Sequence, residues 1–170
     1  MDFTDITEHI LQSHSGVTKD DIWSSSLFER IKVSSTCEKG RFGEKIIKHY
    51  HTLSQDVIEN RTSIQHDIII NGSKVEVKLS CMNKSGYFKW LQIRADDDFD
   101  NLYLVSVFPN EVRIFNIPKK DLMILISENH VKSQHGGKRN INYSIKYLGI
   151  KANAMPDWFT KFEIILKNNI

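Results

Sequence analysis

The dipeptide Asn71-Gly72 constrains the fold more than any other feature of the sequence, because it predicts where the chain reverses. Asn-Gly is the preferred pair for a type I′ β-turn, since both central residues of that turn adopt positive φ. A two-residue loop also fixes which residues of the two strands face each other. The expected register places Asp67 directly opposite Glu76.

The charged residues of this hairpin are expected on one face and its apolar residues on the other, because side chains alternate along a strand. The charged set is Asp67, Glu76 and Lys78, and the apolar set is Ile68, Ile70, Val75 and Val77. Two carboxylates that face each other across an antiparallel pair repel. A magnesium ion would offset the repulsion, because Mg²⁺ binds one or two carboxylates together with water and phosphate oxygens. The same charges, with Lys74 nearby, could also form a solvated strand face held by weak salt bridges.

A helix with one buried face is predicted before the hairpin. Ser35 and Glu38 have the spacing of a capping box, and an apolar stripe follows as far as Tyr50. Glu44 flanks this stripe, where a carboxylate is unusual unless another group pairs with it. Glu44 is therefore a candidate partner of the hairpin charges.

Further elements are predicted on both sides of the hairpin. The first forty residues favour two short helices, the second beginning after Thr18, and Asp20 and Asp21 argue against a DNA-reading helix-turn-helix there. After the hairpin we expect a strand or irregular piece over 87–94, an apolar central strand over 102–108, a strand over 111–117, a helix from Pro118 and a strand over 142–150. A closing helix from Pro156 should pack on the core through Trp158, Phe159, Phe162, Ile165 and Leu166.

Length and composition indicate one globular domain over residues 1–170, with 40% hydrophobic and 26% charged residues. Cys37 and Cys81 lie far apart and lack metal-ligand spacing, so a cytoplasmic protein is expected. No apolar run reaches the length of a membrane span, and the first residues carry acids where a signal peptide carries bases. We therefore expect no membrane association.

Charge is unevenly distributed, although the formal net charge is only +2. The segment from Pro118 to Lys151 contains seven Lys or Arg and two acids, and it could face phosphates. An acidic loop holds Asp96, Asp97, Asp98 and Asp100. It lacks the glycine and the final glutamate of a calcium loop, so we interpret it as a solvated turn.

The order of a helix with Glu44, a strand with Asp67, a turn and then Glu76-Val77-Lys78 resembles the PD-(D/E)XK nuclease superfamily. The resemblance covers about residues 35–127 and implies an α/β (α+β) restriction-endonuclease-like fold. Its αβββαβ core has a mixed central sheet flanked by helices, here with a helical extension over 1–34 and a basic loop and C-terminal helix over 128–170. His66 stands at the position of the family's proline. The QxxxY signature of the exonuclease branch is missing after Gln92, so the resemblance is to type II restriction endonucleases.

Roles for individual residues follow from the resemblance. Asp67 and Glu76 would be the metal-binding acids, Val77 would lend its carbonyl to the metal, Lys78 would position or activate the attacking water, and Glu44 would be the additional helical acid. The implied reaction is Mg²⁺-dependent hydrolysis of double-stranded DNA that leaves 5′-phosphate ends, with Mn²⁺ able to substitute. A homodimer in which each subunit cuts one strand is the expected assembly.

Candidate DNA contacts lie mainly in the basic C-terminal third. Lys138 and Arg139 follow Gly136-Gly137, and the remaining candidates are Lys84, Lys89, Gln92, Gln134 and His135. A basic surface loop with no DNA contact is the alternative. We interpret Tyr87, Phe88 and Trp90 as core residues in preference to base-stacking residues.

Two other functions remain open at this stage. A junction-resolving or repair nuclease of the same fold would carry the same residues. A nucleic-acid-binding or protein-interaction module could keep the hairpin without catalysis.

Overall fold

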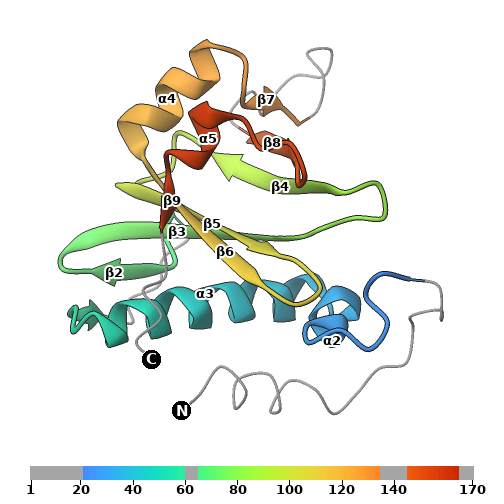
Figure 1. Cartoon of the computed structure of the whole chain (residues 1–170). Coiled ribbons are helices and arrows are strands. Elements are labelled where there is room, and N and C mark those ends of the chain that lie inside the picture. Colours follow the sequence, from blue (N-terminus) through green and yellow to red (C-terminus); the bar gives the residue numbers. More distant parts are fainter. Residues whose placement is uncertain (1–20, 60–64, 135–144, 165–170) are drawn as a thin grey trace.

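The computed structural model describes residues 21–59, 65–134 and 145–164 (Figure 1). The helices in these ranges are α2 (Glu29–Val33), α3 (Thr36–Leu53), α4 (Lys119–Ser127) and α5 (Asp157–Thr160). The strands are β1 (Ile58–Glu59), β2 (Ile68–Ile70), β3 (Ser73–Cys81), β4 (Tyr87–Arg94), β5 (Asn101–Val107), β6 (Val112–Pro118), β7 (Lys132–Ser133), β8 (Ile145–Lys151) and β9 (Glu163–Ile164). Within these ranges no helix combines the length and apolar character needed to cross a bilayer.

The strands form two sheets. The larger has the order β1-β2-β3-β5-β6-β9, and the smaller has the order β4-β8-β7. β3 and β5 are parallel, whereas the other pairs in both sheets are antiparallel. The prediction of an α+β fold with a mixed central sheet flanked by helices is confirmed.

Each face of the larger sheet carries its own apolar cluster. One cluster lies between the sheet and α3, and it joins Phe42, Ile46 and Ile47 to Val77 and Val105. The other lies between the sheet and the β4-β8-β7 layer and contains Phe88, Trp90, Leu102, Leu104, Phe115 and Phe159. Figure 1 shows α3 along one face, with β4, β8 and α4 on the other. β5 supplies side chains to both clusters, as expected of a central strand covered on both faces.

Local signals of the central region are confirmed. Asn71 and Gly72 have φ values of 49° and 79°, and the hairpin pairs Ile68 with Val75, Ile69 with Lys74 and Ile70 with Ser73. The capping box of Ser35 and Glu38 begins α3. The helix predicted from Pro118 is α4, and the segment 87–94 is a strand.

Two predicted helices at the ends of the chain are shorter than expected: the second N-terminal helix forms only as α2, and the closing helix only as α5. Residues 21–27 form turns, because the Asp21 carboxylate accepts from the Trp23 N–H (3.1 Å) and the Ser26 hydroxyl donates to the Trp23 carbonyl (2.7 Å). Such side-chain bonds to the local backbone compete with helical ones. After Pro156 only one helical turn forms, because Ile164 pairs with Ile114 and extends the sheet as β9. The first predicted helix, and Ile165 and Leu166, lie outside the described residues.

A hydrogen-bonded network ties the hairpin tip to the core. The Nδ1 atom of buried His51 lies 2.7 Å from Asp56 Oδ2, and its Nε2 atom lies 3.0 Å from the Tyr103 hydroxyl. The Asn71 side chain donates to the other Asp56 oxygen (2.7 Å). Burial raises the pKa of Tyr103 to about 12, so its hydroxyl keeps its proton and can donate to His51. The hydrogen bonds from His51 and Asn71 lower the pKa of Asp56.

Replacing Asp56 with Asn is expected to lower the melting temperature at neutral pH and to have a smaller effect in acid. A carboxyl group whose pKa is depressed by folding stabilises the fold above its ordinary pKa, here 3.8, and loses that contribution as pH falls through the folded value. Thermal melts of both proteins across a pH series test this, and the two curves should converge below pH 3.8. A difference that stays constant with pH would contradict it.

Candidate active site

Asp67 lies immediately before β2, and its side chain is held by β3. The pairing of β2 with β3 ends at Ile68 and Val75, so the predicted Asp67–Glu76 strand pair is wrong. The Asp67 N–H instead donates to the Val75 carbonyl (2.9 Å), and Asp67 Oδ2 accepts from the Val77 N–H (2.7 Å). The carboxylate thus takes the place that a strand carbonyl would have opposite Val77. This contact fixes the side chain beside β3.

Glu76 and Lys78 project from the face of β3 opposite the one that packs under α3. Val75 and Val77 are buried in the α3 cluster, and alternation along the strand puts Glu76 and Lys78 on the other side. Their side chains form an ion pair of 2.5 Å and are only 13% and 23% exposed. The pKa of Glu76 is raised, chiefly by burial, which outweighs the opposing effect of Lys78, and Asp67 raises it further.

Glu44 comes from α3, on the opposite face of β3 from Glu76, and lies near Asp67. Its side chain is 27% exposed and pairs loosely with Lys48, at 3.9 Å on the same helix. Burial raises the pKa of Glu44, and the negative charge of Asp67 raises it further. Asp67 therefore acts electrostatically on both Glu44 and Glu76.

Close packing of α3 on β3 positions Glu44. The neighbouring residue, Gly43, has no side chain, and a Cβ atom there would lie 3.3 Å from Leu79 Cβ and 3.4 Å from Val77 Cγ1. Because glycine has no Cβ atom, the helix can lie close to β3, the strand that carries Glu76. The sequence signal for this packing was the glycine in the buried stripe.

A magnesium ion, which the sequence resemblance implies, requires oxygen donors. Within the described ranges, no group of three or more Asp, Glu, His or Cys side chains has the arrangement of a protein-only metal site. Burial is the main cause of the raised pKa values of Glu44 and Glu76, and the negative charge of Asp67 adds to both. Carboxylate oxygens suit Mg²⁺, which needs only one or two of them when water and phosphate complete its shell. The residues fit a site of that kind.

Asp97 lies near Glu76, although its loop was predicted to be a solvated turn. Its charge contributes to the raised pKa of Glu76. The loop is held to β3 because the Asp100 carboxylate accepts from the Lys74 N–H (2.8 Å) and the Asp100 N–H donates to the Lys74 carbonyl (2.8 Å). The sequence signal for this placement was the run of aspartates directly before the central strand β5.

Comparison with known proteins does not identify a family for this chain. No family model matches the sequence, and no curated protein matches it. A solved structure of a bacterial homing endonuclease, I-Ssp6803I, aligns with a TM-score of 0.46 and 18% identity, over 77% of this chain and 88% of that chain. A TM-score below 0.5 does not establish a shared fold. The resemblance to PD-(D/E)XK nucleases stays a prediction.

The candidate DNA contacts are distributed over several surfaces. The Gln134 side-chain carbonyl accepts from the Gln92 N–H (2.8 Å), so these two lie together at a bulge in β4. Lys84 is 80% exposed and lies 3.8 Å from Asp21. Lys89 is exposed on β4. Three candidates lie outside the described residues: His135, Lys138 and Arg139.

The aromatic residues of β4 divide between its two faces. Phe88 and Trp90 are fully buried, which confirms their assignment to the core. Tyr87 is 43% exposed, so its assignment to the core is wrong. Alternation along β4 explains the difference, because Tyr87 points away from the larger sheet.

Proposed function

We propose that this chain is a Mg²⁺-dependent endonuclease that hydrolyses phosphodiester bonds in double-stranded DNA. The observation that supports the proposal is the electrostatic coupling of Asp67 to both Glu44 and Glu76, next to the ammonium group of Lys78. Half-buried carboxylates that repel one another are costly to a fold and are characteristic of functional sites.

Each residue has a distinct role in this proposal. Asp67 and Glu76 would hold the metal with the Val77 carbonyl, and Glu44 would contribute directly or through water. When bound, Mg²⁺ polarises a phosphoryl oxygen and lowers the pKa of a bound water molecule. Lys78 would orient that water and stabilise the negative charge that develops on the phosphate, and its partner Glu76 would exchange it for the metal.

The finer form of the proposal is a type II restriction endonuclease that acts as a homodimer and leaves 5′-phosphate ends. A junction-resolving or repair nuclease would use the same residues on a different substrate. A non-catalytic nucleic-acid-binding module would keep Glu76 and Lys78 as a structural ion pair.

Incubation of the full chain with supercoiled plasmid and phage DNA separates these functions. In Mg²⁺ we expect nicked and linear plasmid, in Mn²⁺ the same products, and in EDTA none. Discrete phage fragments would indicate restriction, and preferential cutting of four-way junctions would indicate a resolvase. Failure to cut any substrate, together with DNA retention that weakens with salt, would overturn the nuclease proposal in favour of a binding module.

A further inference from the structure

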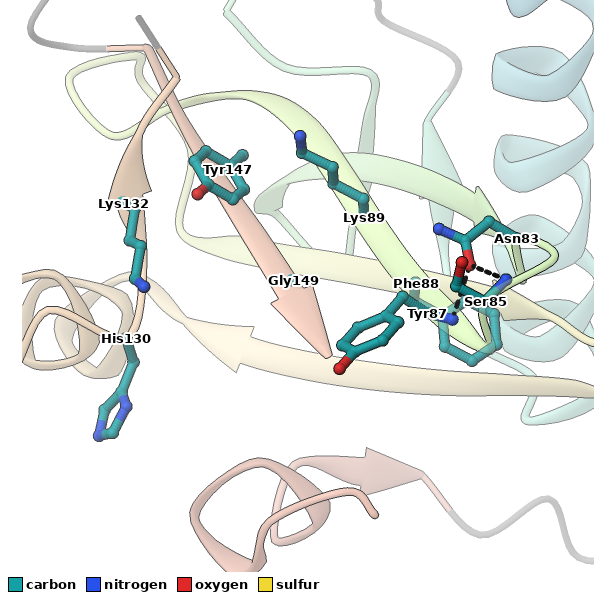
Figure 2. A pocket seen from close by; sticks show the side chains of 9 residues that line it. All are labelled: Asn83, Ser85, Tyr87, Phe88, Lys89, His130, Lys132, Tyr147 and Gly149. Carbon is teal, nitrogen blue, oxygen red and sulfur yellow. Dashed lines mark hydrogen bonds between the residues drawn. The ribbon is translucent and has the colours of Figure 1, made fainter. Parts of the chain in front are cut away.

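The outward face of the β4-β8-β7 sheet carries a cleft of about 520 Å³. Its walls include Tyr87, Lys89, His130, Lys132, Tyr147 and Gly149 (Figure 2). None of the candidate catalytic residues lines it, so it is a separate site from the one on β3. A volume of this size is within the range of pockets that bind small organic groups.

The charge of the cleft favours an anion. Lys89 and Lys132 contribute exposed ammonium groups, and no Asp or Glu is among the described residues that line it. One carboxylate, that of Glu128, approaches a lining residue from outside the cleft and lies 3.5 Å from His130 Nε2. Lys89 Nζ lies 4.7 Å from the centre of the Tyr147 ring, a cation–π contact that holds the ammonium group over the sheet.

Two tyrosines flank a gap on this face. In the ladder, Gly149 pairs with Lys89, while Tyr87 pairs with Lys151 and Tyr147 pairs with Lys132. Same-face positions along a strand are about 7 Å apart, and Gly149, which has no side chain, lies between the Tyr147 row and the Tyr87 row. The Tyr147 ring leans toward this position, with Cε2 3.9 Å from where a Cβ atom of residue 149 would lie. Figure 2 shows Gly149 on β8 between the two labelled tyrosines.

We propose that this face binds single-stranded nucleic acid, with an unpaired base lodged over Gly149 between Tyr147 and Tyr87 and with Lys89 and Lys132 on the phosphates. Exposed aromatic rings on an antiparallel sheet, accompanied by lysines, form a general platform for unpaired bases. Bases in a duplex are already stacked and cannot offer their faces to the rings. The inference rests on the proposed function for the choice of nucleic acid as the polyanion, and it does not require cleavage.

The binding test uses the full chain, a fluorescein-labelled oligothymidylate and fluorescence anisotropy in EDTA. Tyr147→Ala removes one stacking ring, and Gly149→Leu fills the gap. A Cβ atom at Gly149 would lie 3.9 Å from Tyr147 Cε2 and 4.0 Å from the Phe88 carbonyl oxygen, which is ordinary van der Waals contact, and the rest of the leucine side chain would occupy the cleft that Gly149 lines. We expect each variant to raise the Kd for the single strand about tenfold or more, the size expected when a base loses its stacking partner.

Matched controls separate stacking from general effects. Leu91→Ala changes a residue of β4 with the same exposed fraction as Tyr87, 43%, that does not line the cleft, and it should leave the Kd unchanged. Lys89→Ala should weaken binding and reduce its salt dependence more than Lys45→Ala, which removes an exposed lysine of α3. Circular dichroism verifies that each variant is folded.

Two results would overturn the inference. One is a single-strand Kd that Tyr147→Ala and Gly149→Leu leave unchanged. The other is a duplex of the same length that competes as well as the single strand and loses affinity in the same variants, which would make the face a duplex contact. Plasmid that stays uncut in Mg²⁺ would overturn the nuclease proposal and leave this binding result intact.

Discussion

Replacing Glu76 with Gln, or Asp67 with Asn, is expected to slow DNA cleavage by about 10²- to 10⁴-fold. Both changes keep the size of the side chain and remove the negative charge that a metal ion requires. In the Asp67→Asn variant the side-chain amide oxygen could still accept from the Val77 N–H, so the local backbone contact should survive. Nicking of supercoiled plasmid under single-turnover conditions in Mg²⁺ gives the rates directly.

The fold of the Glu76→Gln variant should be at least as stable as that of the wild type when metal is removed. Burial raises the pKa of Glu76, so the folded chain holds a proton more tightly than the unfolded chain does. That group therefore costs stability as pH rises from its ordinary pKa of 4.5 through the folded value. In EDTA at neutral pH we expect a Tm equal to or above that of the wild type.

Mg²⁺ provides a second readout that does not depend on cleavage. A metal that binds the folded state raises Tm by mass action, so Mg²⁺ should raise the Tm of the wild type and have a smaller effect on Glu76→Gln. Glu111→Gln, at an exposed carboxylate that pairs with Arg113, is the matched control and should cut at the wild-type rate. Cleavage at the wild-type rate by Glu76→Gln and Asp67→Asn would show that the site is elsewhere.

Sequence patterns predicted the features that depend on near neighbours. Asn71-Gly72 fixed the hairpin because its turn type needs positive φ at both positions, and Ser35 with Glu38 fixed the start of α3. Alternation placed Val75 and Val77 in the core and Glu76 on the other face. Each of these signals is local, so it does not depend on where the rest of the chain packs.

Long-range pairing accounts for what the sequence could not predict. The parallel ladder of β3 and β5 brings Asn101 beside Val75, and this is what carries the acidic loop toward Glu76. The edge of β6 recruits Ile164 into β9, which overrides the helical periodicity after Pro156. Asp67 leaves the strand register because its own carboxylate satisfies the Val77 N–H. The two partners in each of these contacts are far apart in the sequence, so the periodicity of apolar residues cannot predict them.

Trp90 links the smaller sheet to the larger one. It comes from β4, and its fully buried ring points to the larger sheet, where Nε1 donates to the Val105 carbonyl of β5 (3.1 Å). The ring packs against Phe88, at 5.6 Å between centroids, and against Phe159, at 5.7 Å. One side chain thus joins both sheets and the turn of α5.

We expect Trp90→Ala to lower the free energy of unfolding by about 3 to 5 kcal/mol, the usual cost of deleting a large buried aromatic side chain. The total free energy of unfolding of a natural domain is about 5 to 15 kcal/mol, so the variant would lose much of the wild-type stability. Trp90→Phe keeps a ring but leaves the Val105 carbonyl without this donor, and a loss of about 1 to 3 kcal/mol is expected. Urea unfolding followed by circular dichroism measures both, with Tyr87→Ala as the exposed control on the same strand. If Trp90→Ala cost no more than Tyr87→Ala, the two sheets would not be coupled through this ring.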